Sequence, residues 1–334
     1  MTQLDLPALA NCQRLLIQVE LQPIQGTRFQ PTGFPNLGAA TYSGPDGIAM
    51  LLVESAQSVA NRLEAACWDE AEDDWVAPLR GVPLVKVVDS MNQKLTNSVL
   101  EAHRLNSAYI ESSEWFENFK NELGYDEKAK RPIEMRQKVY PAILKYDPNA
   151  LLHGFFLESI AGVIRSPRAL SGFIEASDVR VASSGGVKND RVDASGKSEG
   201  GGSKEGYGNI PYARDEYVSP SIVAYFNLDL ALLRGFGLGA EAEAFLVAFA
   251  MFKVQRFLTS GLRLRTACDL AIKPGGIRVT SPNGYALPSL LTLEATLPDL
   301  IKAVPGFASP ATTTVVWKPK KTKPSAGAAP EPEE

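Results

Sequence analysis

The sequence has few of the side chains from which most catalytic and metal sites are built. Only two histidines, His103 and His153, occur among the 334 residues. The three cysteines lie far apart and form no CxxC pair: Cys12, Cys67 and Cys268. This pattern argues against a zinc ribbon or a disulfide framework and fits a reducing cytoplasm. We therefore expect no metal, no cofactor and a cytoplasmic location.

Long hydrophobic runs are also absent. The most apolar segment, 244–252, is too short to span a bilayer and continues into Lys253 and Arg256. The N-terminal residues carry Asp5 and lack the basic and apolar regions of a signal peptide. We expect a soluble globular protein without a membrane partner, long enough to bury a substantial core.

Net charge is only −4, whereas proteins that bind nucleic acid through bulk charge are basic. The charge is distributed unevenly along the chain. Residues 64–74 form an acidic block, while residues 253–278 contain six lysines and arginines against one aspartate. Local patches should therefore matter more than the total charge.

One stretch, residues 153–192, sets cations among glycines and small polar residues and then continues into the glycine-rich segment 195–209. These cations are Arg165, Arg168, Arg180, Lys188 and Arg191. Arginine and lysine form charge-assisted hydrogen bonds with phosphates, and glycine lets backbone N–H groups approach closely. The pattern favours a polyanionic ligand. A hydrated strand followed by a surface loop is the alternative that composition leaves open, because acidic residues dilute the charge.

A second group of polar residues lies on a predicted helix that begins after the N-cap Ser55. Val59, Leu63 and Ala66 form its apolar stripe, and four polar residues lie largely off that stripe: Gln57, Ser58, Asn61 and Arg62. Amides, hydroxyls and guanidinium groups hydrogen-bond phosphate and sugar. A merely hydrated helix face has the same composition.

Further candidates are scattered. Arg28 and Phe29, in a loop rich in glycine and proline, offer a guanidinium and a stacking ring to a nucleotide, unless Phe29 fills the core instead. Arg263 and Arg265 are weaker candidates in the basic C-terminal segment. Residues 196–200 match GxSxG, but both histidines precede this loop, so we reject a hydrolase.

Periodicity predicts strands at 14–21, 48–53, 84–88, 222–230 and 312–317. Two short helices are expected within 96–121, a charged helical region at 127–146 broken at Pro132 and Pro141, a buried helix within 235–261 and another helix at 288–304. Residues 263–272 and 276–280 alternate like a hairpin around Pro274 and Gly275. This order is compatible with a split βαβ core among other α+β folds. The tail, 318–334, is predicted to be disordered.

Two blocks of sequence carry a family resemblance: VESAQSVANRLEAACWD at 53–69, and HGFFLESIAG with the RSPRALSGFIEASDVRVASSGGVKNDRV that follows it, within 153–192. They closely resemble the backbone subunit of the type I-G (formerly I-U) CRISPR Cascade, a member of the RAMP superfamily of guide-RNA-binding proteins. The resemblance extends from about Cys12 to Trp317.

The resemblance implies an α+β fold with one elaborated RRM-like (ferredoxin-like) domain over 1–317. It would form a palm with a thumb hairpin at about 179–209 and a helical insertion at about 96–150. It also implies a non-catalytic, antiviral role, in which copies polymerise head to tail along CRISPR RNA and present it to target DNA. Other Cascade subunits and the recruited helicase-nuclease would be partners.

Contacts with RNA would come from the phosphate-binding residues of 153–192, from the helix face and from the weaker candidates. The full set is Arg28, Gln57, Ser58, Asn61, Arg62, Arg165, Arg168, Ser171, Lys188, Asn189, Arg191, Arg263 and Arg265. Two other functions stay open. One is a guide-processing endoribonuclease of the same superfamily, with His153 as the arguable catalytic residue. The other is a general coat protein for single-stranded nucleic acid.

Overall fold

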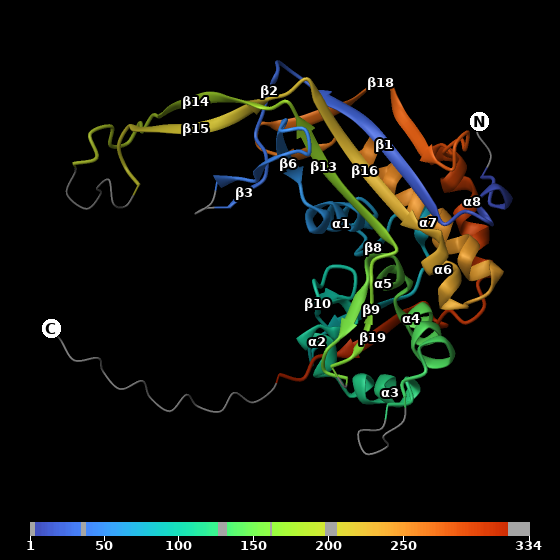
Figure 1. Ribbon diagram of the computed structural model, residues 1–334. Helices are drawn as coiled ribbons and strands as arrows, with labels where there is room; N and C mark the ends of the chain where they lie inside the picture. The colour runs from blue at the N-terminus through green and yellow to red at the C-terminus, as the bar shows by residue number, and fades with distance from the viewer. Residues whose placement is uncertain (1–3, 35–37, 126–131, 161, 198–205, 320–334) are drawn as a thin grey trace.

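The computed structural model describes residues 4–34, 38–125, 132–160, 162–197 and 206–319. Helices and mainly antiparallel strands form a hook-shaped molecule, with a curved sheet and its helices above, a smaller mixed block below and a long hairpin projecting to one side (Figure 1). The expected α+β class is confirmed.

A seven-stranded sheet forms the upper part, in the order β17-β18-β1-β16-β13-β6-β5 with antiparallel neighbours. The strands are β1 (Arg14–Pro23), β5 (Thr41–Ser43), β6 (Ala49–Glu54), β13 (Leu170–Ser177), β16 (Ser221–Asp229), β17 (Arg263–Arg265) and β18 (Cys268–Ser281). Every second residue of β1, β13 and β16 is buried, which is the period of a sheet covered on one face. The predicted strands at 14–21, 48–53 and 222–230 are confirmed.

Helices cover the inner face of this sheet (Figure 1): α1 (Ala56–Ala65), α6 (Leu230–Phe236), α7 (Ala240–Thr259) and α8 (Leu290–Ala303). The central helix, α7, is buried nearly all round, as its alanine-, phenylalanine- and leucine-rich sequence predicts. In the described part of the chain, no helix is both long and apolar enough to cross a membrane.

The four central strands of the sheet, β18, β1, β16 and β13, come fourth, first, third and second in chain order. The helix α1 lies between β1 and β13 in the chain, and α7 lies between β16 and β18. Between β13 and β16 the chain leaves the sheet and forms a hairpin of β14 (Arg180–Lys188) and β15 (Ile210–Val218). The hairpin therefore extends beyond the predicted 179–209 to Val218. A short strand, β2 (Arg28–Phe29), pairs with its base.

The lower block contains a three-stranded sheet of β10 (Lys94–Asn97), β9 (Leu84–Val88) and β19 (Thr312–Val316), in which β19 pairs parallel to β9. Its helices are η2 (Ala77–Leu79), η3 (Arg104–Asn106), α2 (Ala108–Glu111), α3 (Glu114–Glu122), η4 (Met135–Val139, a π-helix), α4 (Tyr140–Tyr146) and α5 (Pro148–His153).

Short two-stranded ribbons are β3 (Gly33–Phe34) with β4 (Gly38–Ala39), β7 (Trp68–Asp69) with β8 (Asp74–Trp75), and β11 (Phe155–Leu157) with β12 (Ile164–Ser166). A 3-10 turn, η1 (Pro7–Leu9), precedes β1.

Two local predictions were wrong. Thr96 and Asn97 belong to β10 rather than to a helix, and the side-chain Oδ1 of Asn97 accepts the N–H groups of Val99 at 2.9 Å and Leu100 at 3.0 Å. An Asn side chain bonded to the backbone two and three residues ahead makes a turn and competes with helix formation. In the helical region that follows, Pro141 lies in the first turn of α4 instead of breaking a helix.

The expected hairpin around Pro274 and Gly275 is instead a bulge within the continuous strand β18. Val19 of β1 pairs with Ile277 and Leu21 pairs with Ile272, so the intervening residues loop out of the ladder. A Cβ on Gly276 would lie 2.9 Å from the carbonyl oxygen of Glu20, so a side chain there would clash with the neighbouring strand. The true turn lies between β17 and β18.

Candidate nucleic-acid interface

The helix α1 begins as predicted. Ser55 has an extended backbone, and its Oγ accepts the N–H of Ser58 at 3.2 Å. Val59 and Leu63 are buried against the sheet, which leaves Gln57 and Asn61 exposed on the first two turns. The helix α1 itself lies on the concave side of the hook (Figure 1).

Arg168, just before β13, reaches this face of α1. Its Nη2 donates a hydrogen bond to Oε1 of Gln57, and Nε2 of Gln57 donates to Oδ1 of Asn61 at 2.9 Å. Three of the predicted contact residues thus form one chain of side chains, although 107 residues separate Asn61 from Arg168 in sequence. The amide of Gln57, itself bonded to Asn61, holds the guanidinium without neutralising it.

The backbone around Arg168 is held by a glycine at the end of α5. Gly154 has φ 80° and ψ 158°, a region that essentially only glycine adopts. A Cβ at this position would lie 3.0 Å from the carbonyl oxygen of Ser166 and 3.2 Å from the amide nitrogen of Arg168. The close approach of these two segments therefore depends on the absence of a side chain at Gly154.

A buried carboxylate, Glu54, organises the second part of the helix face. Its Oε1 accepts a hydrogen bond from Nε of Arg62 at 2.6 Å and one from the hydroxyl of Ser58, and its Oε2 accepts one from Nη2 of Arg265. Arg265 also donates to the carbonyl oxygen of Gln30 at 3.0 Å. Ser58, Arg62 and Arg265 were predicted as RNA contacts, and all three are bound to Glu54.

Two guanidinium groups on one carboxylate leave the cluster with a formal surplus of one positive charge. Burial lowers the pKa of both Arg62 and Arg265 from its ordinary value, but an arginine remains charged in proteins. Burial also raises the pKa of the adjacent Cys268 thiol to about 11, so that the thiol is neutral near pH 7. The side chains of Arg62 and Arg265 are about a quarter exposed, so the surplus charge lies close to the surface, although Nη2 of Arg62 also donates to the carbonyl oxygen of Leu264.

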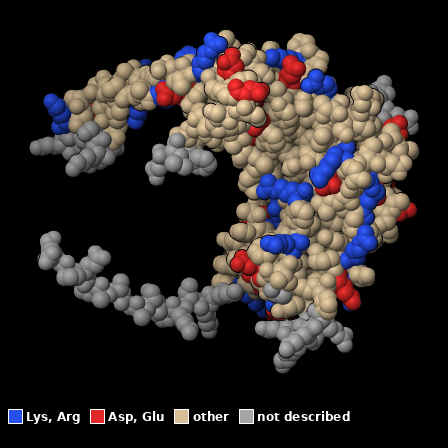
Figure 2. Space-filling model, viewed as in Figure 1, with Lys and Arg blue, Asp and Glu red and all other residues tan. Residues whose placement is uncertain are grey.

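Arg165 lies on the ribbon β11–β12, directly opposite Phe156 in the antiparallel register. Both are exposed, whereas the flanking residues Phe155, Leu157 and Ile164 are buried. Within the described residues the side chain of Arg165 has no ion-pair or hydrogen-bond partner. Figure 2 shows lysine and arginine side chains grouped on the concave side at the level of α1 and just below it.

Lys188, Asn189 and Arg191 lie near the far end of the projecting hairpin, and all three are exposed. Beside them, Asp190 accepts the backbone N–H groups of Val192 at 2.8 Å and Asp193 at 3.1 Å. These backbone hydrogen bonds lower the pKa of Asp190. The carboxylate thus folds the end of the hairpin, where Nζ of the exposed Lys188 also lies 3.4 Å from the carbonyl oxygen of Gly206. Residues 198–205 of the predicted glycine-rich loop lie outside the described residues.

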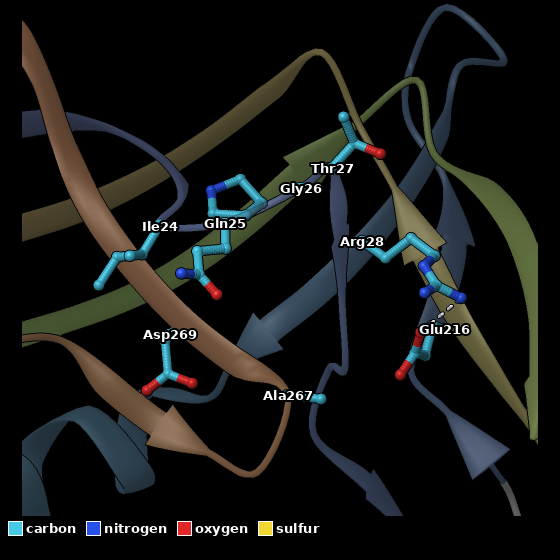
Figure 3. Close-up of a pocket in the computed structure, with 9 residues that line it drawn as sticks. Ile24, Gln25, Gly26, Thr27, Arg28, Glu216, Ala267 and Asp269 are labelled. Atoms are coloured by element: carbon cyan, nitrogen blue, oxygen red, sulfur yellow. Dashed lines mark ion pairs between the residues drawn. The ribbon is translucent and has the colours of Figure 1, made fainter. Parts of the chain in front are cut away.

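Arg28 lies at the base of the hairpin in a pocket of about 520 Å³, where its Nη1 is 3.4 Å from Oε2 of Glu216 (Figure 3). Phe29, 1% exposed, belongs to the core, so the core alternative for this ring is the correct one. Arg263 pairs with Asp269 at 3.6 Å on the exposed edge of the sheet. Glu216 also pairs with Arg214, so Arg28 shares its carboxylate with a second arginine, whereas Arg263 has the carboxylate of Asp269 beside it.

Ser171 is separated from the other candidates by the sheet itself. It is opposite Asn227 in the register, on the face that the helices leave open. The same open face carries the stacked rings of Phe173 and Tyr225, with centroids 5.1 Å apart. Ser171 therefore does not join the group around α1.

His153 is buried, with 2% of its surface exposed, and neither ring nitrogen has a hydrogen-bond partner among the described residues. Burial, together with the nearby charges of Lys253 and Arg104, lowers its pKa well below the ordinary value. The imidazole is thus neutral and out of reach of an RNA on the surface. The structure describes no group of three histidine, cysteine or acidic side chains placed to hold a metal ion.

Sequence reasoning missed two residues of this site, Glu54 and Phe156. Glu54 ends an otherwise apolar strand, AMLLVE, and a carboxylate at the end of such a strand is a usable signal of a buried ionic contact. Phe156 follows another phenylalanine, and only the alternation of β11 decides which of the two rings is exposed.

Comparisons with known proteins add the following. No curated protein matches the chain. A structure titled "CRISPR RNA-guided surveillance complex, pre-nicking" is 15% identical and has a TM-score of 0.40, covering 78% of this chain and 74% of its own. Another, titled "CRISPR RNA-guided surveillance complex", is 14% identical with a TM-score of 0.34, covering 87% and 85%. Csc2 of Thermofilum pendens is 9% identical with a TM-score of 0.31, covering 93% and 77%.

A family model described as CRISPR-associated protein GSU0053 matches residues 15–181, which is half of the chain. The matched region runs from β1 to the first residues of the hairpin. It includes α1, Glu54, the ribbon β11–β12 and Arg168. The chain therefore belongs to the CRISPR-associated protein GSU0053 family.

Proposed function

We propose that this protein is a non-catalytic CRISPR RNA-binding backbone subunit of a type I-G Cascade effector. Membership of a CRISPR-associated family supports the general role, and the resemblance of residues 53–69 and 153–192 supports the subtype. In this role, copies of the chain polymerise head to tail along the guide. They present its bases to target DNA, with other Cascade subunits and the recruited helicase-nuclease as partners.

The observation that carries the proposal is the joining of Arg168 to Gln57 and Asn61 beside the Glu54 cluster. The guanidinium is oriented by neutral amides and keeps its full charge for an anion. Next to it, Arg62 and Arg265 add a surplus positive charge. Phosphate contacts of this kind position a nucleic acid without reading its sequence, as a guide that varies in sequence requires.

The strand order supports an RRM-like palm. The central strands and the helices α1 and α7 follow the β-α-β-β-α-β plan of ferredoxin-like domains, with the hairpin β14–β15 inserted between the second and third strands of that plan. The hairpin would be the thumb, and its exposed cations Lys188 and Arg191 would reach the RNA or the next copy along it. The lower block would be the helical insertion.

Native mass spectrometry on RNAs of increasing length tests this proposal. A backbone subunit should add whole copies stepwise as the RNA lengthens, for any RNA sequence. A variant whose hairpin is replaced by a short turn should bind without forming the long series. Complexes that stay at one copy on every RNA would contradict a polymerising subunit.

A cleavage assay addresses the catalytic alternative. We expect no site-specific cleavage of unprocessed repeat RNA, and no difference between the natural protein and His153→Ala, since the imidazole is buried. Cleavage at one position in the repeat by the purified protein would show a guide-processing endoribonuclease instead.

A further inference from the structure

The ribbon β11–β12 has one open face, and Phe156 lies on it. Phe156 is 43% exposed, and it alone is exposed among the phenylalanines whose side chains the structure describes. The neighbouring Phe155 points into the core instead. Among the described residues no other aromatic ring packs against it, so this exposed ring has no stacking partner in that part of the chain.

Arg165 stands directly across the ribbon from Phe156. Side chains opposite each other in an antiparallel pair share a face, with Cβ atoms about 5 Å apart. Within the described residues this guanidinium has no partner. A planar ring and a free cation side by side are complementary to a base and its phosphate.

The ribbon adjoins the phosphate-binding group described above. Phe155 pairs with Ser166 at the open end of the ribbon, and the adjoining Gly154 lies against the backbone of Arg168. From Arg165 to Arg168 an extended chain spans about 10 Å. The two arginines therefore mark out a short path, with the ring of Phe156 beside its first part.

The local sequence along this path is basic. Between Gly154 and Arg168 the sequence contains one carboxylate, Glu158. It follows β11 at the turn of the ribbon, which is the end away from Arg168. The open end thus presents two arginines to an anion.

We infer that Phe156 and Arg165 form a subsite for one unpaired nucleobase of a single-stranded RNA, with the base stacked on the phenyl ring and its phosphate held by the guanidinium. This inference rests on the proposed function and adds a contact to the base beside contacts to the backbone. The subsite accepts any base, because every base has a flat face and the ring offers no hydrogen bond.

Binding of short RNAs to Phe156→Ala tests the subsite. We expect affinity for an intact RNA to fall about 5- to 150-fold, the range for loss of one base stack on an aromatic ring. Phe156→Tyr keeps the ring and should bind normally, whereas Phe156→Leu keeps an apolar side chain and should not. Val163→Ala removes another exposed apolar side chain, 64% exposed, just ahead of β12, and should bind like the natural protein.

Two further readouts separate stacking from a general loss of structure. When 2-aminopurine replaces the base that occupies the subsite, its fluorescence should be quenched by the natural protein and not by Phe156→Ala. An RNA with an abasic site at that position should bind the natural protein as weakly as the intact RNA binds Phe156→Ala. The variants should keep the melting temperature of the natural protein.

The outcomes distinguish this inference from the proposed function. If Phe156→Ala binds intact RNA as well as the natural protein does, while Arg168→Ala binds weakly, the subsite is wrong and the RNA-binding function stands. If the natural protein binds no RNA at all, both are wrong.

Discussion

Nε of Arg62 donates a hydrogen bond of 2.6 Å to Oε1 of Glu54, a carboxylate whose side chain is fully buried. Glu54 ends β6, Arg62 lies on α1, and Arg265 reaches the same carboxylate from β17. One acidic residue therefore ties a strand, a helix and the sheet edge together at the point where the candidate RNA surface begins. Removal of the carboxylate would leave the guanidinium groups of Arg62 and Arg265, each about three-quarters buried, without their shared partner.

Glu54→Gln is predicted to lower the free energy of unfolding by about 3 kcal/mol, because removing one partner of a buried ion pair leaves the other charge uncompensated. Urea unfolding measures the change. Glu20→Gln, at an exposed position of β1, is the control and should unfold like the natural protein. Equal unfolding curves for the natural protein, Glu54→Gln and Glu20→Gln would show that the ion pairs of Glu54 do not stabilise the fold.

Arg168→Ala should weaken binding to unrelated guide sequences by a similar factor, about tenfold, since one charge-assisted contact to a phosphate is lost. The slope of log affinity against log salt concentration should fall by about one. Arg191→Ala should behave in the same way from the hairpin. Arg80→Ala removes an exposed arginine that pairs with Glu72, and should change neither quantity. A loss confined to one guide sequence would argue for base reading instead.

Gly154→Ala is predicted to weaken RNA binding although Gly154 itself has no side chain to offer. A Cβ would meet the backbone of Ser166 and Arg168 and shift the guanidinium. The matched control is Gly47→Ala, where φ is also positive, at 73°, but nothing lies within 4 Å of the added Cβ. Both variants should lose about 1 kcal/mol or more of stability from backbone strain, and only Gly154→Ala should lose affinity. Equal affinities would mean that Arg168 is not positioned by this contact.

Asp147 predicts a pH dependence of stability. Burial raises the pKa of its carboxyl to about 7, against the weaker opposing effect of Arg104. The folded state therefore keeps this proton between about pH 4 and pH 7, where the unfolded state has lost it, so the contribution of this group to stability falls as pH rises through that window. Above pH 7 both states are ionised and the effect levels off.

Asp147→Asn removes this titration. The stability of the variant relative to the natural protein should rise by about 1.4 kcal/mol for each pH unit between pH 4 and 7. Urea unfolding at a series of pH values measures the difference in stability between the two proteins. Because the pKa of His153 is lowered in the folded state, its contribution to stability is lost as pH falls below the pKa that it has in the unfolded state. Both proteins contain His153, so this opposite trend cancels in the difference. Parallel pH profiles for the two proteins would contradict a raised pKa at Asp147.

Local patterns predicted much of the fold. The alternation of β1 and β16, the N-cap Ser55 and the apolar helix α7 are all confirmed, because neighbouring residues determine them. The bulge at Pro274 and Gly275 could not be told from a turn. Both need the same residues, and only the partner strand β1 decides between them.

The sequence identified many residues of the candidate site but not how they contact one another. The polar face of α1 and Arg168 were identified from sequence, but their contact spans 111 residues between Gln57 and Arg168 and depends on the fold. The sequence did not predict which charged residues pair with each other. Glu54 binds Arg265 across 211 residues, and no local pattern near either residue indicates its partner. The burial of His153 was likewise decided by packing of α5 against α7.

The most direct test of the central claim is to express the protein with its CRISPR array and partner subunits, purify the assembly, and sequence the RNA that accompanies it. A backbone subunit should yield discrete guides flanked by repeat sequence, in a large particle that contains several copies of this chain for each RNA. Recovery of a monomer without RNA, or with random cellular RNA, would contradict the claim.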